Sequence, residues 1–159
     1  MLSELGEKEI RHKNNPFLQG VKHMKLLLFD VEYFWFDTHC KTIESVEDVE
    51  IEERIENTAV VFIHAESEDE ERKNKVITSA VGNIKWYLNK VNKDKIVLHS
   101  FAHLSSSKSS PEFAMEVILS IEEKLKNKGI DVYTVPFGYL YQFSIHVKGE
   151  SLAKVFKEI

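Results

Sequence analysis

The sequence predicts a single α/β domain in which helices pack against a mixed β-sheet. Short runs of strand-type residues alternate along the chain with two long segments whose apolar residues recur every three or four positions. The predicted order is strand, helix, strand, helix and two strands, which places helices against a sheet that contains parallel pairs. With 159 residues, of which 43% are hydrophobic, the chain is long enough to bury one core without disulfides or metals.

The domain is predicted to begin at Met24. Residues 1–23 mix charges of both signs and show no sustained period, so we predict a flexible N-terminal extension followed by a domain over residues 24–159. We expect the extension to be dispensable for folding, which thermal melts of the full chain and of a chain starting at Met24 would test.

The first strand is predicted in residues 25–36, which are dense in apolar and aromatic side chains. Alternation would place Val31 and Trp35 on one face and Phe34 and Phe36 on the other. Because both faces carry rings, we expect a helix to cover one face and a partner surface the other, which favours a homodimer.

Two helices follow from capping and periodicity. Ser67 and Glu70 have the spacing of a capping box, and an apolar stripe from Val76 to Val91 predicts the long helix after it. Ser110 and Pro111 read as an N-cap and a first helical residue, and Gly129 ends the second helix.

The remaining segments complete the predicted sheet. The acidic segment 37–58 predicts a short strand or hairpin. Further strands and a short closing helix are predicted as follows: strands at 59–64, 96–98, 131–135 and 141–147, and the helix at 151–159.

Composition excludes several classes of protein. Cys40 is the only cysteine, so no intramolecular disulfide can form, which fits a reducing cytoplasm. No apolar run approaches the roughly 18 residues of a membrane span, and no secretory signal is visible. The net charge of −5 argues against a protein that binds along an extended nucleic-acid backbone. Gly-rich phosphate-binding motifs are absent, so no cofactor is expected.

A candidate site lies where residues 96–110 leave a buried strand and enter a helix. The segment carries His99, His103 and a run of serines, and such a junction can present side chains to solvent on a rigid scaffold. The alternative is a solvated connection. His99 and His103 are four residues apart but lack a third ligand with motif spacing, so we expect no metal. Tyr139 and Tyr141 flank a Pro-Phe-Gly turn, where aromatic core is the competing interpretation.

Several segments together resemble the archaeal editing domain of threonyl-tRNA synthetase. FAHLSS at 101–106 precedes a helix that begins with proline, PFG at 136–138 precedes a strand that ends in KG and then LA, and MKLLLFDVEY at 24–33 is similar to that family's first strand. The similarity covers Met24 to the C-terminus.

The resemblance implies a fold like that of the D-aminoacyl-tRNA deacylases, a homodimer, and hydrolysis of wrongly attached L-serine from tRNA for threonine. It places the tRNA 3′ acceptor end between the AHLSS loop and the strand after PFG, with His103 as the functional loop histidine. The residues that the resemblance assigns to substrate binding are Ala102, Leu104, Ser105, Pro136, Phe137, Gly138 and Tyr139.

Two ionisable positions depart from the family pattern. Tyr141 replaces a lysine, next to Leu140 in place of a tyrosine, and Lys154 replaces a glutamate. Gly149-Glu150-Ser151 replaces Gly-His-Pro. Lys154 could take over catalysis, with the Tyr141 hydroxyl as its partner; alternatively the site has lost activity. We therefore predict His103, Tyr141 and Lys154 as candidate catalytic residues.

Three functions stay open from the sequence. The chain could be a freestanding deacylase that clears mischarged tRNA in trans, without aminoacylation activity of its own. It could be a silent paralogue that binds tRNA or a threonyl-tRNA synthetase. It could also be a structural dimer without tRNA contact. Ester hydrolysis separates the first from the others, and tRNA binding separates the second from the third.

Overall fold

The computed structural model describes residues 23–159, so the extension predicted for residues 1–23 lies outside the described residues except for His23. Strands and helices alternate in the order that the sequence predicts, with differences at the C-terminal end. Their bounds are β1 (Lys25–Lys41), β2 (Glu52–His64), the 3-10 helix η1 (Ser67–Arg72), α2 (Lys73–Val91), β3 (Lys95–Ser100), α3 (Pro111–Asn127), β4 (Asp131–Thr134), β5 (Tyr139–Val147), the 3-10 helix η2 (Ser151–Ala153) and β6 (Lys154–Glu158).

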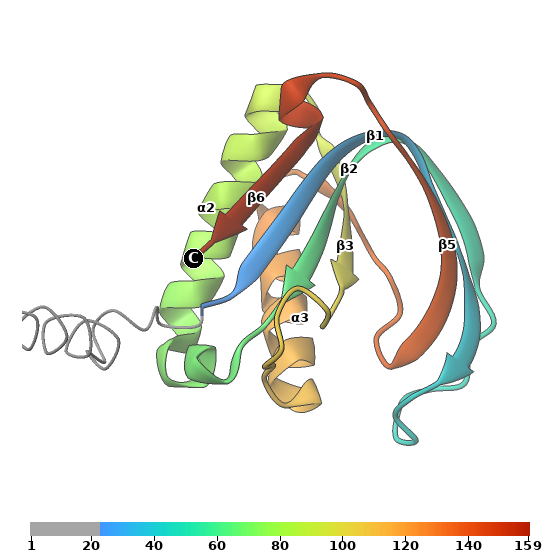
Figure 1. Ribbon diagram of the computed structural model, residues 1–159, viewed down its shortest axis with the longest axis vertical. Coiled ribbons are helices and arrows are strands. Elements are labelled where there is room, and N and C mark those ends of the chain that lie inside the picture. Colours follow the sequence, from blue (N-terminus) through green and yellow to red (C-terminus); the bar gives the residue numbers. More distant parts are fainter. Residues whose placement is uncertain (1–22) are drawn as a thin grey trace, which may run out of the picture.

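The six strands form one mixed sheet in the order β4-β3-β2-β1-β5, and β6 also pairs with β1. The pairs β2–β3 and β3–β4 are parallel, whereas β1 is antiparallel to β2, β5 and β6. Both α2 and α3 lie on one face of the sheet, and the long strands β1, β2 and β5 curl away from them (Figure 1). This is the predicted mixed sheet with helices packed against it.

The helix-covered face holds the larger core. Leu26 and Leu28 of β1, Val61 of β2 and Leu98 of β3 meet the apolar stripes of α2 and α3 there, and all four are fully buried. Burial of apolar area at about 25 cal/mol per Å² makes this layer the main source of stability.

The two helices begin differently from one another. The Ser110 hydroxyl accepts from the Phe113 N–H, and Pro111 follows at the first helical position, so the predicted start of α3 is confirmed. The capping box predicted for Ser67 and Glu70 is wrong by one residue. Glu66 and Asp69 form it instead, and it caps η1, after which α2 begins at Lys73.

The closing segment is a strand rather than the predicted helix. Residues Lys154–Glu158 pair antiparallel with Lys25–Phe29 of β1. The reason is tertiary: β5 pairs with β1 only from Val31 onward, so the first residues of β1 would otherwise keep unpaired backbone groups at that edge.

The predicted alternation along β1 breaks at Glu32. Val31, Phe34 and Phe36 all belong to the core on the face away from the helices, although an even and an odd position cannot share a face of a regular strand. The pairing with β2 skips the position between Val31 and Tyr33, where Asn57 has a left-handed φ of 47°, and the pairing with β5 shifts register there as well. This irregularity turns Phe34 and Phe36 onto the face that Val31 occupies.

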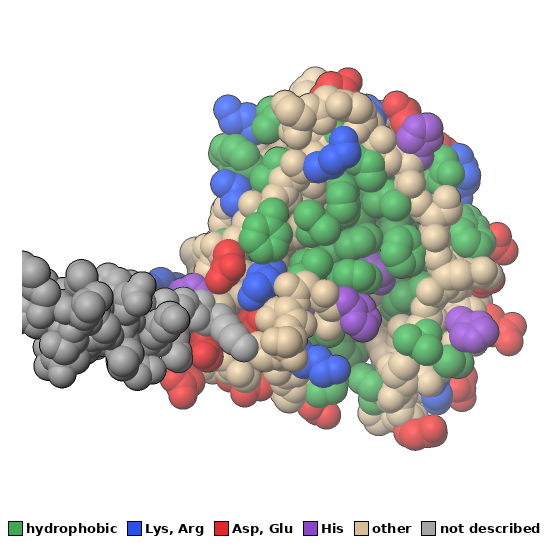
Figure 2. All heavy atoms as spheres, viewed as in Figure 1, with side chains coloured by type: hydrophobic (Ala, Val, Ile, Leu, Met, Phe, Trp, Pro, Cys, Tyr) green, Lys and Arg blue, Asp and Glu red, His purple; other side chains and the backbone are tan. Residues whose placement is uncertain are grey.

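The face away from the helices, called here the open face, is aromatic. Phe29, Phe34, Phe36 and Phe62 pack there, and Phe143 stacks on Phe34 with ring centroids 6.0 Å apart. Hydrophobic side chains line a hollow beside these strands, with histidines at its border (Figure 2). Large apolar side chains stay exposed on or beside this face, including Leu140 at 52% and Phe156 at 53%.

Candidate functional site

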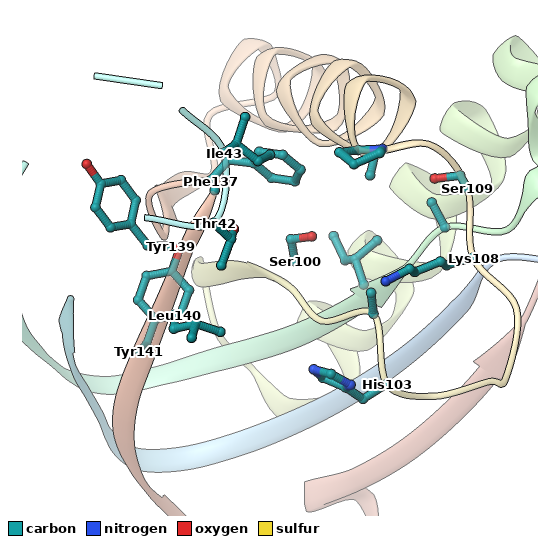
Figure 3. Close-up of a pocket in the computed structure, with 16 residues that line it drawn as sticks. Thr42, Ile43, Ser100, His103, Lys108, Ser109, Phe137, Tyr139, Leu140 and Tyr141 are labelled. Atoms are coloured by element: carbon teal, nitrogen blue, oxygen red, sulfur yellow. The ribbon is translucent and has the colours of Figure 1, made fainter. Parts of the chain in front are cut away.

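A hollow of about 360 Å³, called here the first hollow, opens at the carboxyl ends of the parallel strands. Ser100 ends β3, Ala65 follows β2, and Phe137 follows β4; all three line it. Ligands of α/β sheets bind characteristically at this edge. Figure 3 shows His103 and Lys108 of the β3–α3 loop on one side of the hollow and Tyr139 and Tyr141 on the opposite side.

The β3–α3 loop is fixed by the buried side chain of His64 at the end of β2. The Leu104 N–H donates to His64 Nδ1 at 3.3 Å, and His64 Nε2 lies 2.7 Å from the Ser107 carbonyl oxygen. An Nδ1 that accepts a hydrogen bond carries no proton, so Nε2 carries it and donates to the Ser107 carbonyl. One ring therefore holds the loop at two points, on either side of Ser105.

Glu66 holds the same loop through a second buried group. Its carboxylate accepts from Ser107 Oγ at 2.8 Å and from Lys25 Nζ at 2.8 Å. Burial alone would raise the pKa of Glu66, but the hydrogen bonds from Lys25, Ser107 and Ser105 outweigh it and lower that pKa. Asp69 accepts from the Glu66 and Met24 backbone N–H groups, which ties the network to the start of β1.

His103 stands out from this fixed loop into the hollow. Its side chain is exposed and its ring packs edge-on against Phe101, with centroids 5.0 Å apart. Within residues 23–159, His103 forms no hydrogen bond with a serine hydroxyl, so this geometry contains no paired serine nucleophile and histidine base. An imidazole free to contact a ligand or a water molecule suits proton transfer or orientation instead.

The Pro-Phe-Gly turn forms the opposite wall. Gly138 has φ +86°, and a Cβ at this position would lie 2.9 Å from Val46 Cγ1, so the turn requires glycine. The Thr42 N–H donates to the Gly138 carbonyl at 2.7 Å, which joins the turn to the end of β1. The Tyr139 hydroxyl accepts from the Val49 N–H at 2.8 Å and donates to the Glu47 carbonyl, so it secures the β1–β2 loop while its ring faces the hollow.

Tyr141 lies in both the wall and the open-face core. Its ring contacts Phe36 and His99, with centroid separations of 5.8 and 5.3 Å. Burial raises the pKa of Tyr141, with the neighbouring hydroxyls of Tyr133 and Tyr139 adding to the effect, so the phenol is neutral at pH 7.

Lys154 is not brought together with Tyr141. Lys154 begins β6 opposite Phe29, whereas Tyr141 lies opposite Thr38, nine positions further along β1 and about 30 Å along the strand at its usual rise. The exposed Lys154 donates from Nζ to the Lys148 carbonyl at 3.0 Å and does not line the first hollow. It lies on a strand, so the helix expected for it is absent from this segment.

The structure brings five of the seven predicted substrate-binding positions near one another. Ala102, Phe137, Gly138 and Tyr139 line the first hollow, and Pro136 lines a neighbouring hollow of about 270 Å³ beside α3. Leu104 and Ser105 line neither; they belong to the fixed part of the loop.

His99 is a site residue that the sequence did not single out beyond the metal question. It is 3% exposed at the end of β3, its Nδ1 has no hydrogen-bond partner among the described residues, and burial lowers the pKa of His99 to about 4. Among residues 23–159, no group of three or more His, Cys, Asp or Glu side chains is placed to hold a metal ion. His64 and Glu66 were also missed, because their contacts join positions about 40 residues apart.

The fold and the hollow define a class of protein: an α/β domain with a ligand-sized pocket at the carboxyl ends of its parallel strands, lined by one loop histidine and a glycine turn. None of the helices in the described part of the chain is long and apolar enough to cross a membrane.

Comparison with known proteins gives the family. The family model for the Archaea-specific editing domain of threonyl-tRNA synthetase matches residues 24–159, and this chain belongs to that family. The resemblance seen in the sequence is thereby confirmed.

Curated relatives are much longer proteins. The threonine–tRNA ligase of Thermococcus gammatolerans is 35% identical over 139 residues, which cover 86% of this chain and 22% of that protein. The threonine–tRNA ligase of Methanococcus aeolicus is 37% identical over 137 residues, with the same coverage of 86% and 22%. The matched region of this chain thus spans about a fifth of the length of these relatives.

Among solved structures, a c-Myc DNA unwinding element binding protein is similar with a TM-score of 0.57 and 15% identity, covering 85% of this chain and 98% of that chain. At this identity the likeness concerns the fold alone. It confirms the predicted D-aminoacyl-tRNA deacylase-like fold, a curled mixed sheet with two helices packed against it.

Proposed function

We propose that this chain is a freestanding editing domain that hydrolyses mischarged aminoacyl-tRNA, such as seryl-tRNA for threonine, in trans. One observation carries the proposal: the loop with His103 and the turn with Gly138, which hold the family motifs, border the same hollow. The network of His64 and Glu66 keeps the loop in place before a ligand arrives, and such preorganisation reduces the cost of binding.

The chemistry requires little from the protein beyond positioning. Water attacks the carbonyl carbon of the ester, the bond to the ribose oxygen breaks, and the proton from water passes to that oxygen, giving a free amino acid and a tRNA with a free hydroxyl. In this proposal His103 orients the water or holds its proton, and the adjacent tRNA ribose hydroxyl assists. Lys108, an exposed cation at the border, meets a phosphate of the acceptor end.

The test is deacylation of a panel of charged tRNAs, led by seryl-tRNA and threonyl-tRNA for threonine. We expect hydrolysis by the unaltered chain and a loss of about 10²-fold in His103→Ala, the usual scale for a positioned acid or base. His146→Ala is the matched control, because His146 is an exposed histidine on β5 that does not line the hollow. Activity that is absent, or equal in the unaltered chain and His103→Ala, contradicts the proposal.

A silent paralogue is the second candidate, and a specific observation favours it. Where the related domains carry lysine and glutamate, this chain has a neutral Tyr141 and a Lys154 bonded to the Lys148 carbonyl, outside the first hollow. This candidate predicts tRNA binding, or binding to a threonyl-tRNA synthetase, without turnover. The variant Tyr141→Lys with Lys154→Glu separates the candidates: activity that appears only in this variant means that the site has lost catalysis.

We propose a homodimer formed through the open face. Leu140, Phe143 and Phe156 are exposed on or beside it, and large apolar side chains in one region mark contact surfaces. Light scattering at micromolar concentration should return twice the chain mass, and Phe156→Asp should return the single mass. A single mass for the unaltered chain contradicts the dimer. A cytoplasmic location is also proposed, consistent with the exposed free thiol of Cys40.

A further inference from the structure

A groove of about 520 Å³, called here the helix groove, lies between α2 and α3. Both helices cover the face of the sheet opposite to the open face (Figure 1), so the helix groove stays exposed in a dimer formed through the open face. The described residues that line it come from the middle of α2 and from the C-terminal end of α3: Thr78, Val81, Gly82, Lys85, Lys124, Asn127 and Lys128.

Within the described part of the chain, lysine is the only charged residue type that lines the helix groove. Lys85 comes from α2, and Lys124 and Lys128 come from the end of α3; all three are exposed. None of their ammonium groups forms a hydrogen bond or an ion pair with another residue of the range 23–159, whereas Lys126 of the same helix end is paired with Glu122. Three unpaired cations thus converge on one groove from two helices.

The charge of α2 differs from that of the chain as a whole. Helix α2 contains four lysines and no aspartate or glutamate, although the chain carries a net charge of −5. Carboxylates gather instead in the segment 44–56, which includes the β1–β2 loop. A separation of charge of this kind directs an approaching polyanion towards the helix side of the domain.

The dipole of α3 accounts for only part of this arrangement. Lysines near the C-terminus of a helix interact favourably with its dipole, which is an ordinary role for Lys124 and Lys128. The effect falls off within the last turn, and Lys85 lies six residues before the end of α2. In addition, the Lys128 and Gly129 N–H groups donate to the last carbonyls of α3, so these oxygens are already satisfied.

Gly82 leaves the middle of the helix groove without a side chain. Glycine inside a helix is destabilising relative to alanine, and a Cβ at this position would meet no heavy atom within 4 Å. Packing therefore does not require glycine here. Its effect is to let a ligand approach the backbone of α2 beside Lys85.

The lining favours phosphate groups as the ligand. Recognition of carboxylates would favour the planar fork of arginine, whereas lysine binds phosphate as a point charge. The Thr78 hydroxyl and the Asn127 amide add uncharged donors of the kind that contact phosphate and sugar oxygens. No aromatic side chain of the described residues lines the groove, so nothing there stacks on a base. Such contacts hold a sugar–phosphate backbone without reading its sequence.

The helix groove is within reach of an RNA whose end lies in the first hollow. Ala114 lines that hollow and Lys124 lines the groove, ten positions further along α3, or about 15 Å at the rise of a helix. This distance equals about four or five steps of a nucleic-acid duplex. Two of the three carboxylates in this stretch, Glu116 and Glu122, are paired with lysines, which reduces the repulsion of a phosphate backbone.

We propose that the helix groove binds the sugar–phosphate backbone of the tRNA acceptor arm through the ammonium groups of Lys85, Lys124 and Lys128. This inference rests on the proposed function, which supplies the tRNA and places its 3′ end in the first hollow. The groove is a second point of attachment besides Lys108. It contributes affinity that does not depend on the attached amino acid, so selection of serine is left to the first hollow.

The first experiment measures binding of an uncharged RNA hairpin whose stem and single-stranded 3′ end copy the acceptor arm of tRNA for threonine. In the full chain, Lys85→Gln with Lys124→Gln should weaken binding about tenfold and reduce the slope of log Kd against log salt by about two, because each lysine on a phosphate contributes about one. Absent binding of the hairpin by the unaltered chain overturns the inference.

The matched control is Lys90→Gln with Lys126→Gln. It changes the net charge by the same amount and also removes one exposed lysine from each helix, but neither residue lines the helix groove. This control should weaken hairpin binding less than about threefold, the residual effect of net charge alone. Equal losses in the two double variants would assign the effect to net charge and overturn the inference.

Substitution of Gly82 tests the groove itself. Gly82→Glu places a carboxylate between the lysines, and Gly82→Gln places an uncharged side chain of the same size there; the open space around the position accommodates both. We expect Gly82→Glu to bind the hairpin about tenfold more weakly than Gly82→Gln, with equal melting temperatures. Equal affinities of the two variants overturn the inference.

Two further comparisons separate the alternatives. If poly-L-glutamate loses affinity in Lys85→Gln with Lys124→Gln and the hairpin does not, the groove serves an acidic protein segment and the inference is overturned. Failure of the proposed function is a different result: absent deacylation of seryl-tRNA, together with the expected loss of hairpin binding, removes turnover only. Deacylation of seryl-tRNA with the same KM in both double variants removes the inference only.

Discussion

The two faces of the sheet differ in how they are covered. On the helix side, Leu98 of β3 and Ile121 of α3 are fully buried against one another's layers. On the open face, Phe34 and Phe36 are equally buried, but Phe143 is 39% exposed and its neighbours border the first hollow. Helices α2 and α3 close one face, whereas residues 23–159 leave the other open to a ligand or a second copy.

The difference separates stability from function within one sheet. Residues on the open face, such as Tyr141, can change while the helix-side core keeps the fold. Four predictions test how far this separation holds, in order of their expected effect on the free energy of unfolding.

Leu98→Ala should cause the largest loss in the free energy of unfolding. It empties a fully buried position between the sheet and the helices, where such changes cost about 2–5 kcal/mol. Leu140→Ala is the same substitution at a position that is 52% exposed and should cost less than about 1 kcal/mol. Denaturant unfolding at low protein concentration measures both. Similar losses would mean that the open face is covered as completely as the other.

His99 should make the free energy of unfolding decrease as the pH falls below 6.5. Its pKa of about 4 in the folded chain lies below the ordinary 6.5, so its contribution is complete above pH 6.5 and lost by pH 4. Over this range the unaltered chain should lose about 3 kcal/mol more than His99→Phe, as follows from about 1.4 kcal/mol per pKa unit. His146→Phe should show the pH profile of the unaltered chain. Identical profiles for unaltered chain and His99→Phe would refute a buried neutral imidazole.

Ser107→Ala tests the hydrogen bonds by which Glu66 and His64 hold the β3–α3 loop. It removes a hydrogen bond to the Glu66 carboxylate and should cost about 2 kcal/mol at pH 7, with faster hydrogen exchange at the Leu104 amide. Because the pKa of Glu66 is lowered in the folded chain, this difference exists above about pH 4.3 and disappears as pH falls through the lower folded value. Ser106→Ala, next to it and exposed, is the control and should change neither quantity.

His103→Ala should have the smallest effect on stability, below about 0.5 kcal/mol, because the side chain is exposed. The same variant should lose deacylation or binding of charged tRNA. Parallel losses of melting temperature and function would assign His103 a structural role, and would mean that the loop is part of the core after all.

The sequence predicted those parts of the fold that local patterns determine. Ser110 and Pro111 locate the start of α3, because a cap and a proline act within a few residues of one another. The segment after Ala153 was predicted as a helix because its local pattern cannot report that β1 has an unpaired edge 125 or more residues earlier. The change of face at Glu32 depends on Asn57 in the neighbouring strand, which a period along β1 does not contain.

The candidate site likewise combines features that local sequence predicts with features that depend on contacts between distant segments. The position of His103 in a strand-to-helix loop was predictable from the chain, and its place beside the hollow agrees with that location. The fixing of the loop by His64, and the unpartnered Nδ1 of His99, arise from contacts between distant segments. Their residue types alone carry no signal, since buried histidines are common in ordinary cores.

Two of the strands that pair with β1, β5 and β6, come last in the sequence, and this affects how the protein folds while it is being synthesised. β2 can pair with β1 as soon as residue 64 has been made, but β5 and β6, which cover the other edge of β1, span 139–158. At about 5–20 residues per second, the ribosome needs on the order of 4–15 s to add the 74 residues between the end of β2 and the start of β5. During that interval the nascent hairpin presents a long aromatic edge strand, so a nascent chain stalled before residue 139 should recruit chaperones that one extended beyond Ile159 releases.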